Sequence, residues 1–445
     1  LPFLEPERDW ERIDVWVPRS AGEEPLPCIL IYYGGGWGDK VVGGLKDEIA
    51  ALLAAGYVVA MPDYVLRADH PVPLTVWDGA EAIRFLRANA AEYGIDPARI
   101  GAWGFSAGGW LIQFLGPSDR DTLYPVSHKQ GNERITYPIP MLEPARLSSG
   151  IPLRLQGLVT DWGAGRLREE RLHKLNPGWV GPNASPPLTW HNVGGETPPG
   201  PLLYAAAGAH VETAHIEAKN THVPSTASVA YDRAGNKLTW RARIHQFFEE
   251  QVKNPRRASA PEVFPAPEGT TGSGRVQIVS VHPGAAIHFT RDGSAPTANS
   301  PRYTEPLELA PGETLQAIAV VETLEPSAAA TWRFPAEAAE PLEIAGETAL
   351  LTARVGEPFE YALEATGGPV RWYLAGKRGT HYDKQRKPPG LVPWLEIDPA
   401  TGRLYGTPDA PGTCVVIVAA VAADGEGAGR TAARRLLVRA EPAGE

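Results

Sequence analysis

The hydrophobic positions of the first 250 residues alternate between strand and helix patterns. Continuous apolar runs, typical of strands buried on both faces, occur at Cys28–Tyr33 and Val58–Met61. Apolar residues spaced by three and four from Val76 to Ala90 predict an amphipathic helix that ends near Gly94. The same patterns predict an edge strand at Ile13–Val17, strands at Leu155–Thr160, Leu188–Trp190 and Val211–Ile216, and a closing helix at Leu238–Val252. This order is typical of an α/β fold with a doubly wound, mostly parallel sheet.

The pattern changes after Pro255. Residues 258–274 are rich in Ala, Pro, Gly, Ser and Thr, as in a linker, and the remaining chain shows only short β-type runs separated by Pro and Gly turns. Such a pattern predicts all-β sandwich domains. We therefore divide the chain into an α/β domain at 1–257 and two β-sandwich domains at 258–336 and 337–445.

Composition narrows the possible partners. A chain of 445 residues is too long for one ordinary core, and 43% hydrophobic residues with 13 Trp suffice for several. The net charge of −10, spread without long runs, argues against binding to nucleic acid or to an anionic membrane. No apolar stretch approaches the length of a membrane span.

The two cysteines are placed far apart in the sequence. Cys28 and Cys414 each lie inside an apolar, strand-like run, so we expect two buried thiols rather than a disulfide. Two cysteines cannot make a zinc site by themselves, and we expect neither a metal ion nor a cofactor.

The five residues Gly104–Gly108 carry the strongest chemical signal. A serine, Ser106, has glycine two residues before it and two residues after it, between a strand-like run and a helix-compatible run. This is the pattern of a nucleophile elbow, in which a strained turn exposes the serine and side chains at the flanking positions would collide with backbone. We expect Ser106 to be a catalytic nucleophile.

A second glycine cluster follows the first long apolar strand. The run Tyr33–Trp37 contains three successive glycines, which let backbone N–H groups face a substrate. We expect an oxyanion hole formed by Gly35, Gly36 and Ala107, where each donor is typically worth about 10²–10³ in rate. Trp37 and Trp110 are expected to line an aromatic substrate cleft.

These motifs together resemble the α/β-hydrolase superfamily over residues 10 to 250. The resemblance is to bacterial esterases related to hormone-sensitive lipase and to feruloyl or acetyl-xylan esterases. It rests on Tyr33–Trp37, Asp63-Tyr64 and Gly104–Gly109, with further similarity along Asp78–Arg87 and Tyr93–Ile100. The family's glycine loop begins with histidine where this chain has Tyr33, a departure that concerns the anchoring of the loop.

The resemblance also implies a catalytic base and an acid. The family carries its histidine after the strand at Val211–Ile216, which indicates His222. His210 and His215 flank or lie within that strand and are expected to point away from the elbow, and His245 is expected on the closing helix. The acid remains open between Glu196, beside the position aligned with the family's aspartate, and Asp161, directly after an earlier strand. A third alternative is that neither serves and that activity is impaired.

The carboxy-terminal region carries resemblances of its own. Ile287–Thr297, Tyr303 and Leu315–Val320 resemble the chitobiase/β-hexosaminidase carboxy-terminal type of β-sandwich. Val355–Tyr361, with Trp372 and Leu395–Pro408, resembles Ig-like repeats. Exposed aromatics in these domains are candidates for contact with glycan or a cell surface, although core packing is their commoner role.

We therefore expect a secreted, periplasmic or cell-surface serine esterase. No signal peptide is visible, and the start at Leu1 suggests a processed chain. The predicted reaction is carboxylic-ester hydrolysis through an acyl-enzyme, on polysaccharide-linked acetyl or feruloyl esters or on small acyl esters. The alternatives are a catalytically decayed hydrolase domain that serves as a glycan-binding or scaffold protein, and a polyester hydrolase with the same machinery.

Overall fold

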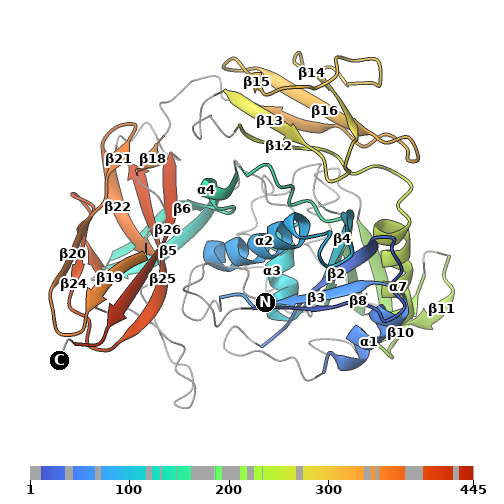
Figure 1. Cartoon of the computed structure of the whole chain (residues 1–445), viewed down its shortest axis with the longest axis horizontal. Coiled ribbons are helices and arrows are strands. Elements are labelled where there is room, and N and C mark those ends of the chain that lie inside the picture. Colours follow the sequence, from blue (N-terminus) through green and yellow to red (C-terminus); the bar gives the residue numbers. More distant parts are fainter. Residues whose placement is uncertain are drawn as a thin grey trace.

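The structure is a computed structural model of the chain (Figure 1). It describes residues 12–35, 44–65, 72–116, 123–130, 133–147, 149–161, 185, 187–192, 211–217, 225–232, 234–266, 274–334, 342–345, 350–375, 394–423 and 430–443.

A single mixed sheet organises the amino-terminal domain. Within the described residues it has nine strands in the order β1-β3-β2-β4-β7-β8-β9-β10-β11. The strands from β3 to β9 in this order are parallel, while β1 at one edge and the hairpin β10–β11 at the other are antiparallel. Their bounds are β1 Ile13–Trp16, β2 Leu26–Tyr32, β3 Val58–Pro62, β4 Ile95–Phe105, β7 Leu158–Asp161, β8 Pro187–Asn192, β9 Glu212–Glu217, β10 Val229–Tyr231 and β11 Lys237–Thr239.

Helices cover both faces of this sheet. Figure 1 shows α2 (Val72–Ala88) and α3 (Ala107–Leu115) together on one face, with α1 (Lys46–Ala54) and α7 (Trp240–Phe248) on the other. A π-helical turn, Glu249–Lys253, extends α7, and a short helix, α4 (Pro144–Leu147), lies between α3 and β7 in the sequence. This doubly covered sheet confirms the predicted α/β class.

Several predicted bounds differ from the observed ones. Helix α2 begins at Val72 and ends at Ala88, and hydrogen-bonded turns continue to Gly94, whose φ is +63°. Leu238 lies in β11 rather than in the closing helix, which begins at Trp240 because the Thr239 side chain caps it by accepting from the Ala242 N–H. Strand β7 begins at Leu158, three residues later than expected.

The sequence patterns missed one hairpin. Strands β5 (Leu123–Gln130) and β6 (Glu133–Pro140) pair antiparallel after α3. Figure 1 shows this hairpin extending away from the sheet toward the carboxy-terminal strands.

The middle region forms two three-stranded sheets around a small core. One sheet contains β12 (Glu262–Pro265), β13 (Arg275–Val279) and β15 (Leu307–Glu308), and the other contains β14 (Ala286–Thr290), β16 (Thr314–Val320) and β17 (Ala330–Arg333). Alternate residues of β13 are buried, as expected for a strand with one face on a core, whereas β16 buries Leu315 and the three successive residues 317–319. The shared core includes Val276, Ile278, Leu315, Ala317 and Trp332.

The last region is also all β. A four-stranded sheet has the order β19-β26-β25-β22, from Leu350–Arg354, Thr431–Glu441, Gly412–Ala422 and Val370–Ala375. A three-stranded sheet of β20 (Phe359–Ala362), β24 (Arg403–Gly406) and β23 (Glu396–Ile397) and the pair β18 (Glu343–Ile344) and β21 (Ala365–Thr366) complete it. All strand pairs here are antiparallel except β19 with β26.

This last sandwich packs against the amino-terminal domain. A hydrophobic cluster joins Leu74 and Trp77 of α2 and Tyr137 and Ile139 of β6 to β25 and β26. Its members on the sandwich side are Val415, Ile417, Ala419, Ala433 and Leu437. The hairpin therefore bridges two domains that are distant in sequence.

The structure describes one of the two cysteine side chains. Cys28 is fully buried in β2 as a free thiol, as predicted, and burial raises its pKa. Cys414 lies on β25, and its side chain is outside the described residues.

Candidate active site

Ser106 sits at a sharp turn between β4 and α3. Its φ of +49° and ψ of −112° make it the one non-glycine residue with positive φ among the described residues. A Cβ on Gly104 would lie 2.5 Å from the Gly108 carbonyl oxygen, and a Cβ on Gly108 would collide with the Tyr32 carbonyl oxygen. Because both flanks require glycine and the serine itself is strained, the turn has the geometry predicted for a nucleophile elbow.

The glycine loop lies directly against this serine. A Cβ on Gly34 would be 2.9 Å from the Ser106 Cβ, and Gly35 has a φ of +144°, which favours glycine. Ala107 is the first residue of α3, so its N–H belongs to the positive end of that helix. Of the predicted donor residues, Ala107 directly follows Ser106 and Gly35 directly follows Gly34 in the loop, whereas Gly36 and Trp37 lie outside the described residues.

Tyr33 anchors the glycine loop through aromatic and polar contacts with Tyr64. The two rings stack with centroids 4.7 Å apart, the Tyr64 hydroxyl donates to the Tyr33 carbonyl oxygen at 2.6 Å, and the Tyr64 N–H donates to the Tyr33 hydroxyl at 3.4 Å. Both side chains are buried. Tyrosine in place of the family's histidine therefore holds the start of the loop to Tyr64, the second residue after β3.

Asp161 ends β7, next to the elbow, but its side chain binds two tryptophans. The Ser106 N–H donates to the Asp161 carbonyl oxygen at 3.0 Å. The fully buried carboxylate accepts from the indole N–H of Trp103 at 2.8 Å and from that of Trp240 at 2.7 Å, one on each oxygen. Asp161 thus ties β4, β7 and α7 together beneath the nucleophile.

Two known protein families match parts of this sequence, and one of the matches includes Ser106 and the glycine loop. The family described as BD-FAE matches residues 13–136, and the family described as chitobiase/beta-hexosaminidase C-terminal domain matches residues 265–331. With the strained serine, its glycine loop and the parallel sheet, the first match decides the class. The amino-terminal domain has the α/β-hydrolase fold. The second match confirms the resemblance predicted for the middle domain.

Curated relatives of the amino-terminal domain include esterases. Carboxylesterase NlhH of Mycobacterium tuberculosis is 40% identical over 110 residues, which cover 24% of this chain and 33% of that protein. Esterase LipC of the same species is 30% identical over 123 residues, covering 27% and 30%. The matches thus span about a third of each relative's own length.

Solved structures also resemble the chain. Esterase 2 of Thermogutta terrifontis in its native form gives a TM-score of 0.37 at 18% identity, with 55% of this chain and 89% of that one covered. An acetyl ester-xyloside bifunctional hydrolase from Caldicellulosiruptor lactoaceticus gives 0.34 at 21% identity, covering 48% and 79%.

The remaining predicted site residues of the hydrolase domain fall mostly outside the described residues. His222, Glu196 and His210 are among them, and His215 lies on β9 with its side chain not described. His245 lies on α7, where burial lowers its pKa. Trp110 of α3 is partly buried with its ring 4.2 Å from that of Phe114, measured between centroids, so its role in substrate binding stays a prediction.

The described residues contain neither a metal-binding cluster nor a membrane-spanning helix. Within them, no group of three or more His, Cys, Asp or Glu side chains is arranged to hold a metal ion. None of the helices in that part of the chain combines the length and apolarity needed to cross a membrane.

The buried Asp161 predicts an unusual dependence of stability on pH. Burial raises its pKa from 3.8 to about 7, although the two indole N–H donors oppose this shift. The folded state thus keeps this proton to a higher pH than the unfolded state. The resulting stabilisation is fully present below about pH 4 and is lost as the pH rises through about 7.

Calorimetric unfolding of wild type and Asp161→Asn will check this sign. Relative to the variant, wild type is expected to lose about 2 to 3 kcal/mol of unfolding free energy between about pH 5 and about pH 8. A difference that stays constant over this range contradicts the expected shift.

Proposed function

We propose that the protein is a serine carboxylic-ester hydrolase that acts through an acyl-enzyme. The observation that carries this proposal is the strained Ser106 with Gly34 packed against it and the α3 N-terminus beside it. His222 removes the Ser106 proton as the hydroxyl attacks the ester carbonyl, and the oxyanion is bound by Gly35, Gly36 and Ala107. The esterase relatives of this domain support the same reaction class.

The sheet topology supports Glu196 as the third member. Strands β4, β7, β8 and β9 are parallel neighbours, so their carboxyl ends share one edge of the sheet. Ser106 follows β4, Glu196 follows β8 and His222 follows β9. Asp161 also lies at this edge, but each of its oxygens already accepts an indole N–H. We therefore assign the acid to Glu196 and a structural role to Asp161.

The proposed substrates are acetyl or feruloyl esters linked to polysaccharide, or small acyl esters. One relative among solved structures is described as an acetyl ester-xyloside hydrolase, and we extend that substrate class to this chain as a proposal. Contact of the carboxy-terminal β-domains with glycan, and a secreted, periplasmic or cell-surface location, belong to the same proposal. Synthetic polyesters remain a substrate class for the same machinery.

Wild-type hydrolysis and active-site labelling test this function. We expect the full chain to release nitrophenol from short-chain nitrophenyl esters and acetate or ferulate from esterified xylan. A fluorophosphonate probe is expected to label the peptide that contains Ser106. Release from nitrophenyl esters without release from xylan would restrict the substrates to small esters.

A decayed hydrolase domain is the competing candidate function. Tyr33 in place of histidine is the observation that favours it. In that case, a folded wild-type chain would neither hydrolyse the esters nor react with the probe, and the glycan-binding or scaffold function would replace the esterase.

A further inference from the structure

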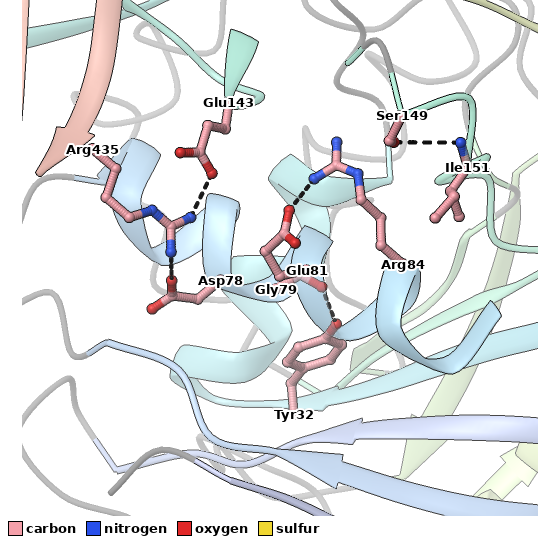
Figure 2. Close-up of polar contacts among 9 residues, drawn as sticks. All are labelled: Tyr32, Asp78, Gly79, Glu81, Arg84, Glu143, Ser149, Ile151 and Arg435. Carbon is pink, nitrogen blue, oxygen red and sulfur yellow. Dashed lines mark hydrogen bonds and ion pairs between the residues drawn. The ribbon is translucent and has the colours of Figure 1, made fainter. Parts of the chain in front are cut away.

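A buried arginine of the last sandwich enters the hydrolase domain. Arg435 of β26 is completely buried, and Figure 2 shows its guanidinium between Asp78 of α2 and Glu143. Its Nη1 lies 3.1 Å from Asp78 Oδ1 and its Nη2 lies 2.7 Å from Glu143 Oε2. The guanidinium carbon is 5.8 Å from the centre of the Trp77 ring. The carboxy-terminal domain therefore supplies a cation that pairs with two carboxylates of the amino-terminal domain.

Asp78 connects this cation to the segment that holds the glycine loop. Its second oxygen, Oδ2, accepts the Val65 N–H at 3.0 Å. Val65 directly follows Tyr64, whose hydroxyl donates to the Tyr33 carbonyl oxygen at 2.6 Å. One carboxylate thus contacts both Arg435 and the backbone next to the loop's anchor.

The neighbouring residue of α2 makes a second connection. The hydroxyl of Tyr32 donates to the Gly79 carbonyl oxygen at 2.8 Å (Figure 2). Tyr32 ends β2 and immediately precedes Tyr33, and it is fully buried. The position of α2 is therefore transmitted to the start of the glycine loop at two points, Tyr32 and Tyr33.

The energetics of the buried charges favour a role in orienting the Asp78 carboxylate over a role in holding the two domains together. Bringing an arginine and two carboxylates out of water costs much of what their attraction returns, so buried ion pairs contribute little net stability compared with apolar packing. The apolar cluster around Trp77 and Ile417 already joins the two domains. Arg435 fixes the orientation of the Asp78 carboxylate, and association of the two domains does not require that orientation.

We propose that the carboxy-terminal β-sandwich is a positioning element of the oxyanion loop, acting through Arg435 and Asp78. The inference rests on the proposed esterase function, because the loop matters only if it binds an oxyanion. Arg435 touches no reacting atom and is a positioning residue. The sandwich thereby becomes part of the catalytic unit rather than an independent appended module.

Kinetics of four variants test the proposal. Arg435→Met removes the cation, Asp78→Asn keeps an oxygen for the Val65 N–H, and Arg435→Met/Asp78→Asn/Glu143→Gln removes all three charges so that no buried carboxylate is left unpaired. Arg403→Met is the matched control, because Arg403 lies in the same sandwich and its pair with Glu360 is exposed. Each variant is assayed with nitrophenyl acetate at a temperature well below the melting temperature of that variant.

We expect kcat of the Arg435→Met and triple variants to fall about 10- to 100-fold with little change in KM, because a displaced oxyanion donor weakens transition-state binding only. The inhibition constant of an aryl trifluoromethyl ketone, which forms a tetrahedral adduct with the serine, should rise by the same factor. Arg403→Met should match wild type. The triple variant is expected to lose no more kcat than Arg435→Met alone, since the effect of Arg435 already passes through the Asp78 carboxylate.

Hydrogen exchange separates failure of this inference from failure of the proposed function. In the Arg435 variants, the amides of the peptides spanning Tyr32–Gly35 and Met61–Val65 should exchange faster than in wild type. In Arg403→Met, their exchange rates should equal those of wild type. If folded variants keep wild-type kcat, ketone inhibition and exchange, and only melt earlier, the positioning role is overturned. If wild type itself is inactive, the esterase function fails, and the exchange result alone decides whether the sandwich orders the loop.

Discussion

Replacing Ser106 by alanine is expected to lower kcat for a short-chain nitrophenyl ester by at least about 10⁴-fold. The hydroxyl is the atom that forms the acyl-enzyme, so its removal leaves only the activation of water by the remaining groups. The strain at Ser106 also leads to an expectation for the stability of the variant. Alanine at a φ of +49° bears the same backbone strain, so the stability of the variant should stay close to that of wild type.

The measurement is steady-state hydrolysis together with circular dichroism. Ser294→Ala is the control, since Ser294 lies in an exposed turn of the middle domain and should leave both signals unchanged. Equal activity of Ser106→Ala and wild type would show that any hydrolysis comes from another group, and the proposed nucleophile would be wrong.

Replacing Glu196 by glutamine is expected to lower kcat by about 10⁴-fold while leaving stability almost unchanged. An amide can donate a hydrogen bond to the histidine and so favour the tautomer that cannot accept the Ser106 proton. It also lacks the negative charge that stabilises the imidazolium. The size of the effect follows from the role of the acid, and it would be the second largest among the substitutions discussed.

Asp161→Asn is the matched comparison. An asparagine places an N–H₂ group against one of the two indole N–H donors, so this variant should lose stability more than it loses kcat. The opposite ranking, with kcat lost in Asp161→Asn and retained in Glu196→Gln, would transfer the role of the acid to Asp161. Retention of kcat in both would mean that catalysis proceeds without either carboxylate.

The sequence alone was sufficient to predict the strained turn at Ser106 because the constraints on that turn are local. The flanks Gly104 and Gly108 are needed because a Cβ there meets backbone within a few residues or on the adjoining strand. Such steric requirements leave a readable pattern of residue types. The continuous apolar runs at Cys28–Tyr33 and Val58–Met61 likewise mark strands buried on both faces, and the observed β2 and β3 confirm them.

Other features had no local pattern. The hairpin β5–β6 is stabilised by packing of Tyr137 and Ile139 on strands nearly 300 residues away, so its own sequence gave no clear period. Asp161 looked like a candidate acid because it directly follows a strand. Only the folded chain shows that Trp103 and Trp240 bind both of its oxygens.

The elbow, the glycine loop and the fold class were thus determined by the sequence, since each depends on backbone geometry over a few residues or on regular hydrophobic spacing. The tertiary structure decided the surroundings of the carboxylate at Asp161 and the pairing of Arg435 with Asp78. Both depend on which side chains burial brings together. A charged residue in a strand is usually exposed, and nothing in the sequence near Arg435 indicates that its partners lie in another domain.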